Sequence, residues 1–126
     1  MTMPTKDLTV LIIDENAGVG AALAQRLRSS KGVRVVGHTE NPVLGAELAH
    51  ELKPEVIVAD FRPTGPPRTE TYRWLARVAP RSRLVVLSSF YTEGEERACI
   101  DAGAKKCLLK GISTDDLVGE LRSLVA

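Results

Sequence analysis

The sequence predicts an α/β fold built on a doubly wound, five-stranded parallel sheet. Short apolar segments rich in β-branched residues alternate five times with segments of helical periodicity, and this alternation is typical of a parallel sheet with helices on both faces. The apolar segments 8–13, 56–59 and 84–87 are more continuous than 33–38 and 106–109. The first three are therefore expected at the centre and the other two at the edges, which fits the flavodoxin-like strand order 2-1-3-4-5.

Length and composition are those of one ordinary globular domain. We expect residues 1–126 to form a single domain, because the chain has 44% hydrophobic and 26% charged residues. A net charge of +1 argues against a partner bound mainly by charge, such as bare DNA. There is no apolar stretch of 18 residues and no signal-peptide segment. We therefore expect a cytoplasmic protein without membrane contact, in which Cys99 and Cys107 stay reduced and act as small hydrophobes.

Capping residues and apolar periodicity predict the helices. Short polar residues are expected to cap helix starts where they precede the periodicity, namely Asn41, Thr69, Thr92 and Ser113. Gly32 and Gly103 are expected to close the first and fourth helices, since left-handed geometry at a helix end favours glycine. Apolar residues at helical spacing are expected to face the core. In the first three helices these are Val19, Leu23 and Leu27, then Leu44, Leu48 and Leu52, then Tyr72, Leu75, Ala76 and Ala79.

Polar residues end four of the five predicted strands. In an open parallel sheet the ligand crevice lies outside the carboxyl ends of the strands, and these ends carry Asp14 and Glu15, Asp60, Ser88 and Lys110. Each residue alone is a weak signal, because a single acid at a strand end is more often a cap or a turn residue. Four strand ends with matching chemistry predict a functional site at one rim of the sheet.

The chemistry of these residues points to phosphoryl transfer. Three crowded carboxylates repel each other unless a cation joins them, and few carboxylates with room for water suit Mg²⁺. A lysine supplies a point charge for a phosphate or for Asp60, and the Ser88 hydroxyl can donate to a phosphoryl oxygen. Asp60 as a nucleophile, with Mg²⁺ and Lys110, would make an aspartyl-phosphate site.

Four segments carry a resemblance to a known family over essentially the whole chain. They are Leu-Ile-Ile-Asp-Glu at 11–15, Val-Ile-Val-Ala-Asp at 56–60, Leu-Val-Val-Leu-Ser-Ser at 84–89 and Gly-Ala-Lys-Lys-Cys-Leu-Leu-Lys-Gly-Ile-Ser at 103–113. With them the chain resembles the receiver domain of bacterial two-component response regulators. The last segment is most similar to receivers whose output is a LuxR-type helix-turn-helix.

The resemblance implies a role for each rim residue. It implies that Asp60 accepts a phosphoryl group from a sensor histidine kinase, with Ser88 as the switch hydroxyl and Lys110 as the family's lysine. Mg²⁺ would be held by Glu15, Asp60 and the backbone carbonyl of Arg62, with Asp14 contributing through water. A receiver of this kind is a signalling module in a phosphorelay rather than an enzyme, and it acts on an output domain or a partner protein.

Three departures from the family pattern leave an alternative open. Glu15 stands where aspartate is usual, Pro63 comes one residue early in the loop after Asp60, and Cys107 occupies a position that is usually aromatic. The extra methylene of Glu15 moves its ligand oxygens, whereas Mg²⁺ demands near-ideal octahedral geometry. The alternative is a degenerate receiver that keeps the fold and acts as a phosphorylation-independent protein-interaction module.

Two enzyme hypotheses fit the residues less well. The Gly18-Val19-Gly20 segment hints at a dinucleotide site, but Leu23 fills the third glycine position and the acidic pair would repel a pyrophosphate. A haloacid-dehalogenase-type phosphatase resembles the site in its aspartate nucleophile. By that resemblance it needs a second aspartate two residues further on, where this chain has Asn16 or Arg62.

The face formed by the fourth helix, the final strand and the last helix is the expected contact surface. It carries charges of both signs, at Glu95, Glu96, Arg97, Asp101, Lys105, Lys106, Glu120 and Arg122. Mixed charge suits a reversible, salt-sensitive contact, so we expect a monomer or a weak homodimer through this face. We do not expect this chain by itself to bind DNA specifically, because it has neither a basic patch nor a reading helix.

Overall fold

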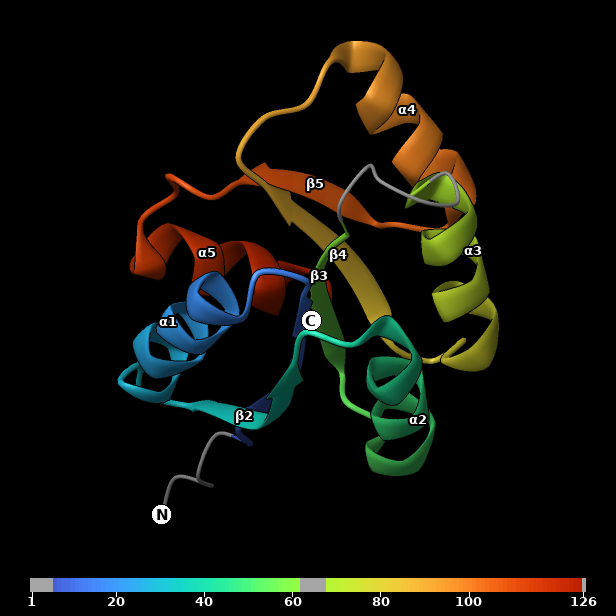
Figure 1. Ribbon diagram of the computed structural model, residues 1–126. Coiled ribbons are helices and arrows are strands. Elements are labelled where there is room, and N and C mark those ends of the chain that lie inside the picture. Colours follow the sequence, from blue (N-terminus) through green and yellow to red (C-terminus); the bar gives the residue numbers. More distant parts are fainter. Residues whose placement is uncertain (1–5, 62–67, 126) are drawn as a thin grey trace.

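The computed structural model describes residues 6–61 and 68–125, in which strands and helices alternate strictly along the chain (Figure 1). The strands and helices in chain order are β1 (Leu8–Asp14), α1 (Ala17–Arg28), β2 (Val33–Thr39), α2 (Pro42–Leu52), β3 (Val56–Asp60), α3 (Arg68–Val78), β4 (Arg83–Ser88), α4 (Glu93–Ala102), β5 (Lys106–Leu109) and α5 (Thr114–Ser123). All strand pairs are parallel and the order is β2-β1-β3-β4-β5. The predicted fold class, strand order and edge strands are therefore confirmed.

The helices cover the sheet in two layers. Helices α1 and α5 lie on one face, and α2, α3 and α4 lie on the other (Figure 1). Successive side chains of a strand point to opposite faces, so Leu11 and Ile13 of β1 pack under α2 while Val10 and Ile12 pack under α1. Because β1, β3 and β4 are buried on both faces, their sequences are apolar up to the strand ends, apart from Thr9 in β1 and Arg83 at the start of β4.

The predicted caps at Asn41, Thr92 and Ser113 are confirmed. The Asn41 side chain accepts from the Val43 and Leu44 amides, and Ser113 accepts from the Asp116 amide. Thr92 and Glu95 form a reciprocal capping box. Gly103 ends α4 with φ +124°, and a Cβ there would lie 2.8 Å from the Cβ of Ala76, so this position requires glycine for both conformation and space.

Two predicted helix boundaries are wrong. Helix α1 ends at Arg28 with Ser29 as its C-cap, so Gly32 does not close it. Gly32 does have a left-handed φ of +78°, but it lies in the turn directly before β2. Its carbonyl accepts hydrogen bonds from the Leu8 amide and the Arg122 guanidinium. Helix α3 already includes Arg68, so Thr69 lies inside the helix and does not precede it.

The predicted inward face of α2 is wrong for Leu44 and Leu52, two of its three leucines. Leu44 and Leu52 are 44% and 42% exposed, and the buried residues are Gly45, Ala46 and Ala49. A Cβ at position 45 would lie 2.6 Å from Cδ1 of Ile13. Helix α2 therefore approaches the sheet so closely that only small residues fit directly beneath it. Leu44 and Leu52 are displaced toward solvent, whereas Leu48 is half-buried and packs against the core as predicted.

In α1, Leu23 and Leu27 are buried as predicted, whereas Val19 is 36% exposed. In α3, Tyr72, Leu75 and Ala79 are buried as predicted, whereas Ala76 is half-buried. Within residues 6–61 and 68–125, no helix combines the length and the apolar character needed to cross a membrane.

Candidate functional site

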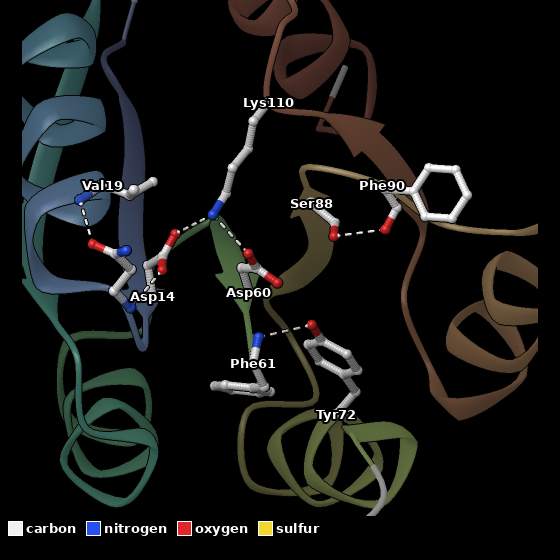
Figure 2. A network of polar contacts seen from close by, with 9 residues as sticks. Asp14, Val19, Asp60, Phe61, Tyr72, Ser88, Phe90 and Lys110 are labelled. Carbon is white, nitrogen blue, oxygen red and sulfur yellow. Dashed lines mark hydrogen bonds and ion pairs between the residues drawn. The ribbon is translucent and has the colours of Figure 1, made fainter. Parts of the chain in front are cut away.

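The carboxyl ends of the central strands bring the predicted site residues to one rim. Asp14 and Asp60 are register partners at the ends of β1 and β3, and the Glu15 amide donates to the Asp60 carbonyl at 3.2 Å. On the other side of β3, the Lys110 amide donates to the Ser88 carbonyl at 2.9 Å, which holds the end of β5 against the end of β4. Figure 2 shows Asp14, Asp60, Ser88 and Lys110 gathered around this rim.

The Lys110 amine lies between the two aspartates (Figure 2). Its Nζ is 3.0 Å from Oδ2 of Asp14 and 2.6 Å from Oδ2 of Asp60. The three side chains are only 19%, 6% and 18% exposed, respectively. Burial lowers the pKa of Lys110, but its hydrogen bonds and charge interactions with Asp60 and Asp14 outweigh burial and raise that pKa above its usual value. Lys110 is therefore a fixed positive charge beside the Asp60 carboxylate.

Asp14 is held by its second oxygen as well. Its Oδ1 accepts from the Asn16 amide at 2.8 Å, and Asn16 in turn caps α1 by accepting from the Val19 amide at 3.1 Å. The start of α1 thus fixes the orientation of the Asp14 carboxylate. An acid in this position also benefits from the partial positive charge at a helix N-terminus.

The residue after Asp60 is anchored by a contact that the sequence did not reveal. The Phe61 amide donates to the Tyr72 hydroxyl at 3.0 Å, and the two rings stack with centroids 4.8 Å apart (Figure 2). Tyr72 is fully buried, so this contact ties the end of β3 to the middle of α3. Periodicity predicts Tyr72 only as a core residue and gives no sign of what its hydroxyl binds.

Ser88 faces the loop that follows β4. Its hydroxyl donates to the Phe90 carbonyl at 3.0 Å (Figure 2), and the residue is only 5% exposed, whereas the Phe90 side chain is 71% exposed. In this state the Ser88 hydroxyl donates its hydrogen bond to the loop that follows β4 and not to the Asp60 side chain. A charged acceptor on Asp60 would compete for it, because hydrogen bonds to charged groups are roughly twice as strong as neutral ones.

Tyr91 connects the same loop to β5. Its hydroxyl donates to the Cys107 carbonyl at 3.1 Å. Burial, together with the charge of nearby Glu96, raises the pKa of the Tyr91 phenol above its usual value, so the hydroxyl remains a donor. An aromatic side chain is thus present beside position 107, although it comes from the β4–α4 loop and not from β5.

The rim offers a small set of oxygen donors for a metal ion. Among residues 6–61 and 68–125, no three His, Cys, Asp or Glu side chains are arranged to hold one. Glu15 is half-buried, and the predicted Arg62 carbonyl and Pro63 lie outside the described residues. Mg²⁺ usually takes only one or two carboxylates and completes its shell with water and phosphate oxygens, so the Asp14–Asp60 pair fits this ion as a two-carboxylate site.

Comparison with known proteins identifies the family. The sequence model of the response regulator receiver domain matches residues 10–122. The chain belongs to this family. Two relatives are the transcriptional regulatory protein LiaR of Bacillus subtilis, 29% identical over 116 residues, and the nitrate/nitrite response regulator NarL of Escherichia coli, 30% identical over 118 residues. These alignments cover 92% and 94% of this chain but 55% of each relative, so the receiver spans about half the length of these relatives.

Solved receiver structures share the fold. The response regulator domain of Thermotoga maritima CheB superposes with a TM-score of 0.79 at 25% identity, covering 94% of this chain and 96% of that one. The signal receiver domain of NarL from Mycobacterium tuberculosis gives a TM-score of 0.82 at 20% identity, covering 94% and 95%. The family and fold predicted from the strand-end motifs are therefore confirmed.

Proposed function

We propose that this receiver domain takes a phosphoryl group from a sensor histidine kinase onto Asp60 in a Mg²⁺-dependent reaction. The observation that carries the proposal is the position of Lys110, whose amine contacts both the Asp14 and Asp60 carboxylates at the rim of the sheet. The family supports the same role for this rim. The domain would signal through an output domain or a partner protein and would not turn over a diffusible substrate.

The chain's own residues would act mainly by position and charge. An Asp60 carboxylate oxygen forms a bond to phosphorus while the phosphorus–nitrogen bond to the kinase histidine breaks, and the leaving imidazole takes up a proton. A carboxylate is a poor nucleophile in water, so alignment and charge neutralisation have to lower the barrier. Lys110 would stabilise a phosphoryl oxygen from one side, and the anchored Phe61 amide would hold the acceptor strand in place.

The metal would be held at the acidic rim. By the family resemblance, Glu15, Asp60 and the Arg62 carbonyl would hold the ion, with Asp14 contributing through water. Mg²⁺ bound there would neutralise the negative charge of the incoming phosphoryl oxygens. Ser88 would then leave the Phe90 carbonyl and donate to the phosphoryl group, which releases the β4–α4 loop that Tyr91 links to β5.

Beryllofluoride and backbone NMR test this proposal. We expect Mg²⁺-dependent binding in the wild type, with amide shifts that spread from Ser88 through residues 89–107. Asp60→Asn should lose the response, whereas Asp101→Asn, a matched change of an exposed acid on α4, should keep it. Shifts of equal size in wild type and Asp60→Asn would contradict the assignment of Asp60.

A degenerate receiver is the second candidate, and one observation favours it. Glu15 does not join Asp14 and Asp60 in a three-residue metal cluster within the described part of the chain. A protein with this rim could fold and bind partners without phosphorylation. If the wild type binds no Mg²⁺ at millimolar concentration and forms no adduct, this second function is the correct one.

A further inference from the structure

A groove between α2 and α3 is not explained by the phosphoryl-transfer site. The two helices contact each other on one face of the sheet (Figure 1). The groove has a volume of about 960 Å³ and is lined by Val43, Ala46, Glu47, His50, Glu51, Trp74, Arg77, Val78 and Pro80. The rim with Asp60 contributes none of these residues, so this surface is distinct from the site described above.

The groove has an exposed apolar surface. Val43 is 58% exposed on α2, and Trp74 is 39% exposed on α3. Trp74 is the single tryptophan of the chain, and aromatic anchors of this kind are enriched at protein interfaces. Exposed large apolar residues that gather in this way mark a surface that another molecule covers.

The two walls of the groove carry opposite charges. Helix α2 presents Glu47 and Glu51 to the groove and helix α3 presents Arg77. Arg73 lies one helical turn before Arg77 on α3, outside the groove lining, and all four side chains are exposed. Within residues 6–61 and 68–125, the ion pairs join Lys110 to Asp14 and Asp60 and Lys106 to Glu120, and none of them involves a groove residue. The acids and the arginines therefore remain available to a molecule that carries the complementary arrangement.

We propose that a second copy of this chain covers the groove in a two-fold dimer. A two-fold interface uses the same patch on both subunits and must be self-complementary. If the axis runs along the groove, α2 of each copy faces α3 of its partner. Glu47 then lies opposite Arg77 of the partner subunit, the same pair recurs by symmetry, and Val43 and Trp74 of the two copies cover each other. One patch with an acidic wall and a basic wall meets this requirement.

The dimer should be weak and sensitive to salt. Exposed ion pairs contribute little individually and are screened by salt, and the apolar centre of the groove is small. We expect a dissociation constant on the order of 10–100 µM, which lies in the range of transient contacts. The α2–α3 dimer is independent of phosphorylation, so it can form whether or not Asp60 is an acceptor.

Reversing the charge at position 47 or at position 77, and then mixing the two variants, tests whether Glu47 pairs with Arg77 of the partner subunit. Glu47→Arg places like charges at both pairs of a homodimer, and so does Arg77→Glu, so each variant alone should dimerise about tenfold or more weakly than wild type. A mixture of the two variants has opposite charges at both pairs, and we expect it to form a heterodimer of near wild-type affinity. Recovery in the mixture also shows that both variants are folded.

Sedimentation equilibrium up to about 1 mM gives the affinities, and Trp74 emission, which should shift to shorter wavelength on association, gives an independent signal. Arg97→Glu on the exposed face of α4 is the control for a dimer through the α4–β5–α5 face. A wild type that stays monomeric overturns the proposal. So does a dimer that Arg97→Glu weakens while Glu47→Arg and Arg77→Glu leave it intact, or a mixture of variants that stays monomeric.

Discussion

Replacing Lys110 by methionine should destabilise the fold by about 2–3 kcal/mol at neutral pH. The lysine contacts two carboxylates whose side chains are 6% and 18% exposed. Its removal leaves Asp14 and Asp60 side by side with no cation between them. Breaking a fully buried pair by removing one partner costs about 3–5 kcal/mol, and the partial exposure of Asp60 places the expected loss below that range.

Lys106 provides the matched control for this substitution. It forms an ion pair with Glu120 in which the side chains are 37% and 38% exposed, so Lys106→Met should cost less than about 1 kcal/mol. Urea unfolding of wild type, Lys110→Met and Lys106→Met under identical conditions measures the difference. If Lys110→Met costs no more than Lys106→Met, the argument that Lys110 neutralises a buried acidic pair is wrong.

The same variants give a second, independent readout. Mg²⁺ should stabilise Lys110→Met more than wild type, because the cation replaces the missing ammonium at the two carboxylates. A stability deficit that does not change with Mg²⁺ would show that the loss comes from packing and not from charge.

Other predictions concern the packing of α2 on the sheet, the β4–α4 loop and the stability of the protein at high pH. Gly45→Ala should destabilise the protein by about 1–3 kcal/mol, because the added Cβ would lie 2.6 Å from Cδ1 of Ile13. Gly119→Ala is the control: a Cβ there meets nothing within 4 Å, so it should stabilise α5 by up to about 1 kcal/mol. Thermal unfolding measures the stability of both variants. Tyr91→Phe removes the hydroxyl that donates to the Cys107 carbonyl, so it should cost about 1 kcal/mol of stability in urea unfolding. It should also reduce the amide shifts that reach β5 when beryllofluoride binds. Undiminished shifts at β5 would exclude Tyr91 from the switch. The raised pKa of Lys110 means that its pairs stabilise fully below pH 10.5 and lose this contribution as the pH rises through the folded-state pKa, so wild type should lose more stability than Lys110→Met in that window.

The sequence predicted the sheet well because continuous apolar segments leave little choice. A strand buried on both faces reads as an unbroken apolar run, and the polar residue that ends the run marks the rim. For this reason the sequence alone is enough to locate Asp14, Asp60 and Ser88 at strand ends. Their meeting follows from the parallel register, in which Asp14 and Asp60 are partners.

Helix α2 could not be predicted in the same way. Its three leucines have perfect helical spacing, yet only Leu48 packs against the core, and the fully buried residues of the helix are Gly45, Ala46 and Ala49. Periodicity identifies large apolar residues and overlooks small ones, so it misses a helix that approaches a sheet closely. Val43, the residue before the displaced Leu44, is 58% exposed and lines the groove beside α3.

The hydrogen bonds that the β4–α4 loop makes near the site also could not be predicted from the sequence. The hydrogen bonds from Ser88 to the Phe90 carbonyl and from Tyr91 to the Cys107 carbonyl depend on the path of the β4–α4 loop. Loop geometry leaves no periodic signal. Cys107 could be recognised as unusual for its position, but the tyrosine that lies beside it comes from 16 residues earlier in the chain.

The most direct test of the central claim is the location of a covalent adduct. The protein is incubated with a small phosphodonor with and without Mg²⁺, and peptide mass mapping identifies the modified residue. We predict a phosphoryl group on Asp60 that forms only with Mg²⁺ and is absent from Asp60→Asn. An adduct on another residue, an Asp60 adduct that forms equally well without Mg²⁺, or no adduct at all would contradict the proposal that Asp60 is a metal-dependent phosphoacceptor.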